Sequence, residues 1–364
     1  MLSGAIDQQI VNSNRLDIAD ALLGLVCGLA MLAYWSIEVL ILNGVDDRGI
    51  LPGWMAVSQM GLSLLVLLFT GLLFHLVFLL LSKKRPGTPR EWLRQYGPQW
   101  LRYCFFCLII MSALAVYTPI KQSIFLVQGN SIDVFLMHMM WYVGFGDFPW
   151  HRLQPLLGHP LVTVGIDRIY TAGAATTLWL TTCVVMMQPK KRRLAEQYAL
   201  ANVAVTALLG SVLAYLFASA GPCFYGRMGL TPDPYAPLMS YLRGVNATYG
   251  LESIALQDRL WSGYISHGAV LGGGISAMPS MHMAYMTLAA LGAWQFSRAY
   301  GVAVWLVTLI VYLGGIHLAW HYTADGMVSF VLVILIWRIC GWIVASIVTR
   351  SSIHESRLAA QRGV

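Results

Sequence analysis

The sequence predicts an all-α membrane protein, a polytopic bundle of about eight transmembrane helices. Hydrophobic residues make up 58% of the 364 residues and charged residues only 11%, whereas soluble domains carry about 45–50% and about 25%. A soluble fold of this length would expose far more apolar surface than water tolerates. The apolar residues also fall in long runs that suit helices crossing a bilayer, and not in the short alternating segments of a membrane barrel.

Eight apolar runs come close to or exceed the roughly 20 residues that a helix needs to cross the hydrocarbon core. The first, second and fifth are the clearest, while Asp167 and Arg168 dilute the fourth. A polar stretch rather than a true loop separates the last two. The predicted spans are 18–43, 54–82, 99–120, 162–188, 198–220, 278–297, 301–320 and 322–348.

Lys and Arg gather after every second span, and short cytoplasmic loops are the ones that retain basic residues. Both termini are therefore expected in the cytoplasm. The net charge of +7 follows from this topology and implies no nucleic-acid partner. The basic residues expected on the inner side are Arg15, Lys83, Lys84, Arg85, Arg90, Arg94, Lys190, Lys191, Arg192, Arg193, Arg298, Arg350, Arg357 and Arg362.

Two long segments, 121–161 and 221–277, join spans on the predicted outer side and are rich in aromatic residues, Gly and Pro. Within them, 130–150 and 251–264 are expected to form helices that lie on the membrane surface. The chain shows no internal repeat and reads as one membrane domain. Its expected parts are N-terminal helices and an outer loop at 1–160, a catalytic helical core at 161–348 and a cytoplasmic tail at 349–364.

The first segment with the character of a site is Pro279-Ser280-Met281-His282. Proline in the first turn and serine near the N-cap suit the start of a helix. His282 then falls in the first turn of the sixth span. Helix N-termini offer free backbone N–H groups and a positive dipole end, and these bind phosphate.

The second segment runs from His317 to Asp325 and contains His321. His321 and Asp325 are four residues apart, which places them on one helix face. The carboxylate can accept the imidazole Nδ1–H, which leaves Nε2 free as a nucleophile or base. The expected topology brings this segment, the 279–282 segment and the outer end of the fifth span, 219–227, to the same face of the membrane.

Pro279-Ser280-Met281-His282 resembles the PSxH motif of the type 2 phosphatidic acid phosphatase (PAP2) superfamily, and 321–325 resembles its HxxxD motif. The wider pattern, with Gly221-Pro222 and Tyr225, is more similar to the branch of inositol phosphorylceramide synthases and sphingomyelin synthases. Asp167-Arg168-Ile169-Tyr170 is also similar to that branch. The resemblance covers 198–348 and implies a PAP2-like helical core.

The resemblance implies an enzyme in which His321 attacks the phosphorus of a lipid phosphate or phosphodiester and becomes a phosphohistidine. Asp325 would orient and stabilise His321, and His282 would protonate the leaving oxygen. The partners implied are a membrane phospholipid or lipid phosphate and a lipid or polyol acceptor. Neither a cofactor nor a metal is required, because cations and helix N-termini can hold the phosphate oxygens.

The sequence departs from the superfamily pattern in its cations. The KxxxxxxRP motif is absent, and Gly314-Gly315 stands where Ser-Arg usually precedes the second motif. This loss favours a synthase-like phosphotransferase over a simple phosphatase. The candidates for replacement cations on the outer side are Arg227 first, then Lys121, Arg168, Arg243 and Arg259. The residues expected to bind substrate are Ser280, His317, Arg227, Tyr225 and Arg168.

Three alternatives to a lipid phosphotransferase are open from the sequence. The first is a PAP2-type phosphatase that hydrolyses phosphatidic acid or polyprenyl pyrophosphate. The second is a membrane metalloenzyme, since His317, His321 and Asp325 recur at helical spacing and His282 could add a ligand. The third is a transporter that only binds its substrate, although no repeated halves support it.

Overall fold

The computed structural model describes most of the chain beyond residue 88. The predicted first span, 18–43, and most of the second lie outside the described residues. So do several basic residues of the expected inner side, among them Arg15, Lys83 and Lys190. The described residues are 61, 64–65, 68–69, 71–72, 75, 88–128, 131–187, 191–266 and 273–361.

Across these described residues the protein is all-helical and contains no β-strand, as the sequence predicts. The π-helical and 3-10 segments are labelled η. The elements are α4 (Pro89–Gln128), α5 (Asp133–Val143), α6 (Pro149–Leu157), α7 (Pro160–Arg168), η1 (Ile169–Gly173), α8 (Ala174–Met186), α9 (Arg192–Val205), η2 (Thr206–Leu213), α10 (Ala214–Leu216), η3 (Pro222–Phe224), η4 (Gly226–Met228), α11 (Ala236–Tyr249), α12 (Glu252–Ile265), α13 (Met281–Phe296), α14 (Arg298–His317) and α15 (Thr323–Gln361).

Within the described part of the chain, five helical stretches are long and apolar enough to cross a membrane. They correspond to the third, fourth, fifth, seventh and eighth predicted spans, and they make this a multi-pass membrane protein. The predicted count of eight is not confirmed. The five stretches are Gln99–Phe125, Pro160–Met186, Arg192–Leu216, Arg298–His317 and Thr323–Ile347.

The predicted sixth span, 278–297, forms the shorter helix α13. Its 16 residues extend about 24 Å at 1.5 Å per residue, less than the roughly 30 Å of a hydrocarbon core. Ser280 and Ser297 explain both limits, because each is extended and caps a helix: the Ser280 hydroxyl accepts from the Met283 N–H, and the Ser297 hydroxyl accepts from the Tyr300 N–H. The chain therefore stops α13 and starts α14 at a single residue.

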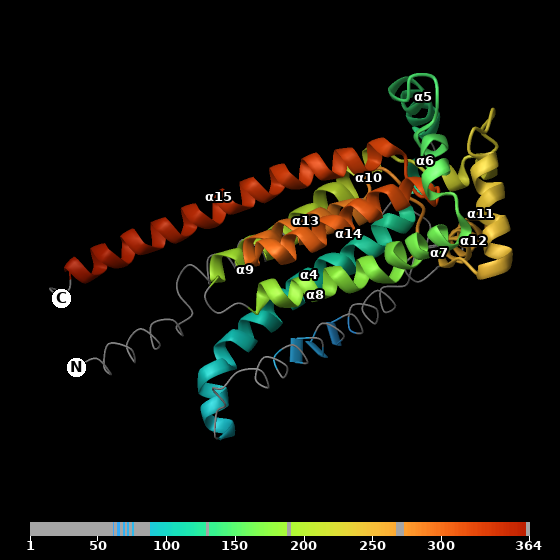
Figure 1. Cartoon of the computed structure of the whole chain (residues 1–364). Helices are drawn as coiled ribbons and strands as arrows, with labels where there is room; N and C mark the ends of the chain where they lie inside the picture. The colour runs from blue at the N-terminus through green and yellow to red at the C-terminus, as the bar shows by residue number, and fades with distance from the viewer. Residues whose placement is uncertain are drawn as a thin grey trace.

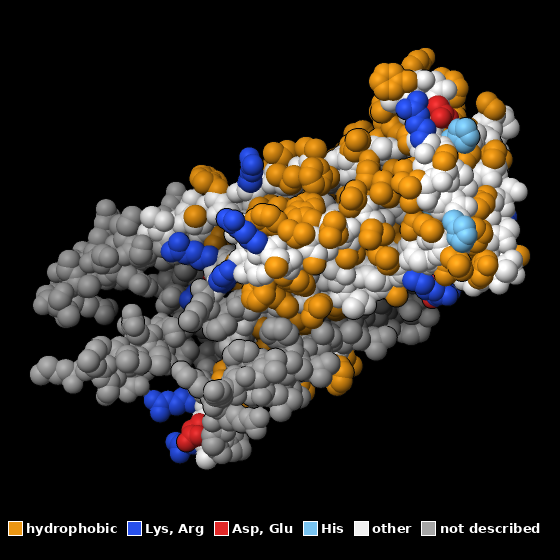
Figure 2. All heavy atoms as spheres, in the orientation of Figure 1, with side chains coloured by type: hydrophobic (Ala, Val, Ile, Leu, Met, Phe, Trp, Pro, Cys, Tyr) orange, Lys and Arg blue, Asp and Glu red, His pale blue; other side chains and the backbone are white. Residues whose placement is uncertain are grey.

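Helix α13 lies at the centre of the bundle and packs against α8, α9, α14 and α15 (Figure 1). Its Ala284, Ala289, Ala290 and Ala293 are completely buried. Such small side chains let neighbouring helices approach closely where lipid replaces water. Figure 2 shows hydrophobic side chains spread along the flank of the bundle, as expected of a surface that faces lipid.

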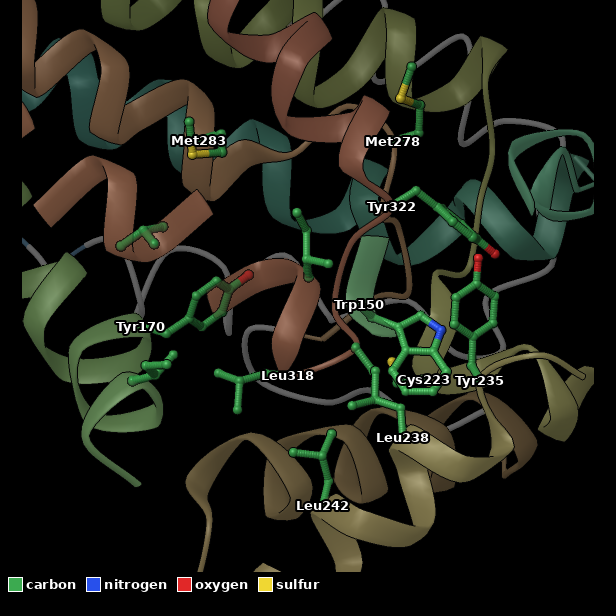
Figure 3. Packing of buried hydrophobic residues seen from close by; sticks show 14 of the residues in the cluster. Trp150, Tyr170, Cys223, Tyr235, Leu238, Leu242, Met278, Met283, Leu318 and Tyr322 are labelled. Carbon is green, nitrogen blue, oxygen red and sulfur yellow. The ribbon is translucent and has the colours of Figure 1, made fainter. Parts of the chain in front are cut away.

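The described parts of the two long segments predicted for the outer side gather at one end of the bundle, where α5, α6, α11 and α12 lie beside the ends of α7, α14 and α15 (Figure 1). The helix expected at 251–264 is confirmed as α12, and 130–150 divides into α5 and the start of α6. Trp150, Leu238, Leu242 and Leu318 share a buried cluster here (Figure 3). This cluster supports the turn between α14 and α15, on which the candidate site is built.

Candidate active site

His282 stands in the first turn of α13, as the Pro-Ser sequence before it predicts. Ser280 is the N-cap, and its hydroxyl accepts from the Met283 N–H at 3.3 Å. The Ser280 N–H donates to the Asp325 carbonyl at 3.2 Å. This backbone bond ties the start of α13 to the start of α15, so the two predicted motifs are held side by side.

His321 lies in the short turn between α14 and α15, and α15 begins at Thr323. Its Nδ1 lies 3.3 Å from Oδ2 of Asp325. An ionised carboxylate can only accept, so Nδ1–H is the donor in this long hydrogen bond. The same carboxylate oxygen accepts from the Tyr322 N–H at 2.9 Å. The Asp325 side chain is completely buried. The predicted His-Asp pair is therefore present, with Nε2 of His321 opposite the bond to the carboxylate.

The rings of His282 and His321 lie side by side in an edge-on arrangement, with 6.2 Å between their centroids and 61° between their planes. Tyr170 of η1 stacks on His282 at 4.5 Å and lies nearly parallel to Trp320 at 6.4 Å. The π-helical turn η1 is a local widening of the helix of a kind that often occurs at functional sites. η1 places the ring of Tyr170 against both the ring of His282 and Trp320, the residue before His321.

The third predicted segment, 219–227, joins the other two through backbone hydrogen bonds. The Cys223 N–H donates to the Ala319 carbonyl at 2.8 Å, and the Ala277 N–H donates to the Ser219 carbonyl at 2.7 Å. Gly221 has φ of +95°, and a Cβ there would lie 2.6 Å from the Trp320 carbonyl oxygen. Only glycine fits this position without strain. Three polar helix ends far apart in the sequence thus form one unit.

Asp133, at the start of α5, was not among the predicted site residues. Its carboxylate is completely buried. It accepts from the backbone N–H groups of Ala220 at 2.7 Å and Gly221 at 2.9 Å, and from the Tyr322 hydroxyl at 2.7 Å. The hydroxyls of Ser131 and Ser219 also donate to it. One acidic side chain thereby joins α5, the 219–221 segment and the residue that follows His321.

A cavity of about 440 Å³ opens beside the histidine pair. His282, His321, Tyr170 and Lys121 lie on its wall. The remaining wall is largely apolar and comes from α4, α8, α12, α13 and the segment before α13. Its apolar lining residues include Ala174, Ala175, Leu178, Phe224, Leu256, Leu260, Ile275, Met281 and Met286.

The other predicted substrate-binding residues lie away from this wall. Ser280 is used as the cap of α13, and Tyr225 packs against Tyr235 with ring centroids 5.6 Å apart. Nε2 of His317 lies 2.9 Å from the Thr163 hydroxyl, behind the turn. Arg227 pairs with Asp258, and Arg168 pairs with Glu252. The sequence correctly predicted that these five residues lie at the same end of the bundle as the two histidines. It did not predict that none of the five lines the cavity.

The surroundings of His321 favour its neutral form. Burial lowers the pKa of His321 from 6.5 to about 4, a hydrogen bond with the Ala277 backbone opposes this shift, and the charge of Lys121 adds to it. At neutral pH the imidazole therefore keeps the lone pair that a nucleophile requires. Among the described residues, no three His, Cys, Asp or Glu side chains come together in a group that could hold a metal ion.

Fold and site together define a multi-pass helical membrane protein with a His-Asp pair and a second histidine on the wall of one cavity. A family model of the PAP2 superfamily matches residues 141–339, more than half of the chain, so this chain belongs to the PAP2 superfamily. Comparison with curated proteins and with solved structures gives no significant match. The superfamily comprises phosphatases and phosphotransferases that act on lipid phosphates, and membership indicates a membrane enzyme of this type. The finer resemblance to the sphingolipid synthase branch is not confirmed.

The packing explains why Gly314 and Gly315 can replace the Ser-Arg of the superfamily pattern. A Cβ at Gly314 would lie 2.8 Å from a methyl carbon of Ile166 and 3.4 Å from the ring of Tyr170. A Cβ at Gly315 would lie 3.3 Å from Cδ2 of His321. The space beside these two glycines is thus filled by Ile166, Tyr170 and the ring of His321.

Proposed function

We propose that this protein is an integral-membrane lipid phosphotransferase that moves a phosphoryl or phospho-head group through a phosphohistidine on His321. The observation that carries the proposal is the position of His321. It is hydrogen-bonded to Asp325, lies next to His282 and lines a largely apolar cavity. Superfamily membership supports phosphoryl chemistry. The apolar wall supports a lipid as the molecule that brings the phosphate.

In the first half-reaction, the Nε2 lone pair of His321 attacks phosphorus. The P–N bond forms as the P–O bond to the leaving group breaks, and His282 gives its proton to the leaving oxygen. The negative phosphate beside His282 favours the protonated form that this step needs. Asp325 holds Nδ1–H and stabilises the positive charge that develops on the ring of His321.

In the second half-reaction, a hydroxyl group attacks the phosphorus of the phosphohistidine. His282, now neutral, takes the hydroxyl proton, and the P–N bond breaks to restore the lone pair of His321. A lipid or polyol hydroxyl gives transfer, and water gives hydrolysis. We place this chemistry on the extracytoplasmic side, because the basic loops of the sequence favour that orientation.

Hydrolysis of a lipid phosphate is the second candidate function. The same residues would act in the same order, with water as the acceptor. Two observations favour transfer. The cavity wall beside the histidines is largely apolar. The cations that usually bind a phosphate monoester in the superfamily are also missing, because Gly314-Gly315 stands in place of Ser-Arg and the KxxxxxxRP motif is absent.

The proposal is tested with purified protein in detergent, supplied with a mixture of phospholipid donors and lipid or polyol alcohols, with products identified by mass spectrometry. His321→Ala and His282→Ala are each expected to lower turnover by about 10²–10⁴-fold while circular dichroism stays that of the wild type. His151→Ala changes an exposed histidine that does not line the cavity and serves as the matched control. Full activity in both cavity variants would overturn the assignment.

Oxygen-18 water separates the two candidate functions. Hydrolysis incorporates the label into released phosphate or phosphorylated head group, whereas transfer yields a new phosphate monoester or diester of the acceptor alcohol without it. Labelled product as the only product would replace the phosphotransferase by the phosphatase. The nucleophile and the acid would keep their roles in either case.

A further inference from the structure

We propose that Lys121 of α4 is the residue that holds the phosphate group of the substrate, so that a helix outside the matched catalytic core supplies the anion-binding cation. This inference rests on the proposed function, since it names the residue that binds the reacting group at the same site. The ligand it implies is an amphiphile with a phosphate monoester or diester.

Lys121 is the only Lys or Arg among the described residues that line the cavity, and it shares that wall with His282 and His321. Its charge acts on both imidazoles. A phosphate bound in this cavity can therefore meet the ammonium group and the histidine pair together. A cation in a largely apolar pocket gains most from an anion that enters with its own charge.

The other candidate cations are occupied elsewhere. Arg227 pairs with Asp258, and Arg243 lies 3.7 Å from the same carboxylate. Arg168 pairs with Glu252. Arg259 is exposed on α12 and is not on the cavity wall. Within the described part of the chain, Lys121 alone combines a positive charge with access to the histidines.

The position of Lys121 is fixed by the segment that leads to His282. Gly274 in that segment has φ of +95°, and a Cβ there would lie 2.6 Å from the Lys121 carbonyl oxygen. The two backbones are therefore in direct contact. Ile120, Ser123 and Ile124, in the same turn of α4, are completely buried. A rigid helix turn thus presents Lys121 at a set distance from the first turn of α13, as pre-organised binding requires.

The rest of the cavity indicates what is attached to the phosphate. Ala174, Ala175 and Leu178 form an apolar surface on α8, inside a stretch long enough to cross the membrane. Leu256 and Leu260 of α12 face the cavity from the outer end. An apolar chain lying along α8 with its phosphate at Lys121 fits both surfaces, whereas free inorganic phosphate would use only the polar end.

The test compares Lys121→Met, which keeps the apolar stem and removes the charge, with the wild type. Arg193→Met removes an exposed cation of α9 that is not on the cavity wall and is the matched control. Two quantities are measured on the full-length protein in detergent. One is the Kd of inorganic phosphate, from its effect on the thermal unfolding midpoint; the other is the KM for the lipid donor found in the activity assay.

Lys121→Met is expected to raise both constants by about 10- to 100-fold, as for loss of a charge-assisted hydrogen bond, and Arg193→Met to leave both unchanged. Unchanged constants in Lys121→Met overturn the inference even if His321→Ala is inactive, which leaves the proposed function standing. Phosphate binding that depends on Lys121 without any lipid turnover would retain the inference and reject the function. A raised KM with an unchanged Kd for phosphate overturns the inference, because Lys121 would then act on the lipid chain and not on the phosphate. If Lys121→Met does not fold, Lys121→Gln is read by the same criteria.

Discussion

At the scale of single residues, the chemistry depends on an imidazole that its surroundings keep neutral. Burial and the charge of Lys121 both lower the pKa of His321, to about 4. The acidic limb of kcat/KM reports the free enzyme's base. Protonation removes the lone pair on Nε2, so activity is lost only when His321 becomes protonated. We therefore expect the midpoint of this limb to lie well below pH 6.5, and kcat/KM to be retained as the pH drops from about 7 to 5.

A pH profile on a saturable lipid donor measures this limb. Lys121→Met gives an internal check on the sign: loss of a positive neighbour raises the pKa of His321, so the acidic limb moves to higher pH. An acidic limb centred at or above pH 6.5 in the wild type would contradict the neutral, buried His321.

Asp325→Asn addresses the second half of the proposed catalytic pair. The amide keeps the shape of the carboxylate but can no longer stabilise a positive ring on His321. We expect kcat to fall by about 10²–10⁴-fold with KM changed by less than about threefold, because Asp325 lies behind His321 and not on the cavity wall. Steady-state kinetics on the lipid donor separate the two constants. A rise in KM of about 10²-fold or more with kcat unchanged would instead place Asp325 in substrate binding.

At the scale of elements, three helix ends are joined by hydrogen bonds from segments far apart in the sequence. Asp133 of α5 accepts from backbone N–H groups 87 and 88 residues away and from a tyrosine 189 residues away. It therefore acts as a latch that fixes the 219–221 segment against the turn of His321. This role belongs to α5, which is not among the five described stretches long and apolar enough to cross a membrane.

Asp133→Ala leaves several buried donors without an acceptor, and each such donor costs about 1–3 kcal/mol. We expect the free energy of unfolding to fall by at least about 3 kcal/mol, with Asp133→Asn intermediate because it keeps one acceptor oxygen. Thermal unfolding followed by circular dichroism measures the loss. Asp147→Ala changes a partly exposed, ion-paired aspartate in the turn after α5. It is the control and should leave the unfolding midpoint nearly unchanged, because exposed ion pairs contribute little to stability. Equal thermal unfolding midpoints for Asp133→Ala and Asp147→Ala would contradict the stabilising role of Asp133.

Helix starts and motif pairs could be predicted from the sequence because they depend on local chemistry. Ser280 caps α13, and Asp325 meets His321 one turn away, as their spacing indicates. Asp133 could not be predicted, because all but one of its partners lie 86 or more residues away in the sequence and two of them are backbone N–H groups, which a pattern of side chains does not record. Lys121 was only one of several cations predicted on the outer side. What singles it out is its place on the cavity wall beside both histidines, which depends on tertiary packing.

At the scale of the whole molecule, the structure places all the polar motifs at one end of a bundle whose flanks are apolar. Five stretches of the described chain can cross a membrane, and α13 with its histidine is packed among them. The first residues of α13 meet the start of α15, and its last residues meet the start of α14 at Ser297. Helix α13 therefore runs antiparallel to α14 from the end of the bundle that holds the site toward the other end.

The orientation of the molecule in its membrane is the prediction that belongs to this scale. The basic residues that follow the even-numbered spans place Arg193 on the cytoplasmic side, while Arg152 of α6 lies with the outer segments. Arg193→Cys and Arg152→Cys are expressed singly in intact cells and treated with a membrane-impermeant thiol reagent. The native Cys107, Cys183, Cys223 and Cys340 are buried, so the wild type provides the background. We expect the reagent to label Arg152→Cys before lysis and Arg193→Cys only after it. The opposite pattern would put the His282–His321 cavity on the cytoplasmic side, and the lipid donor would then have to come from the inner leaflet.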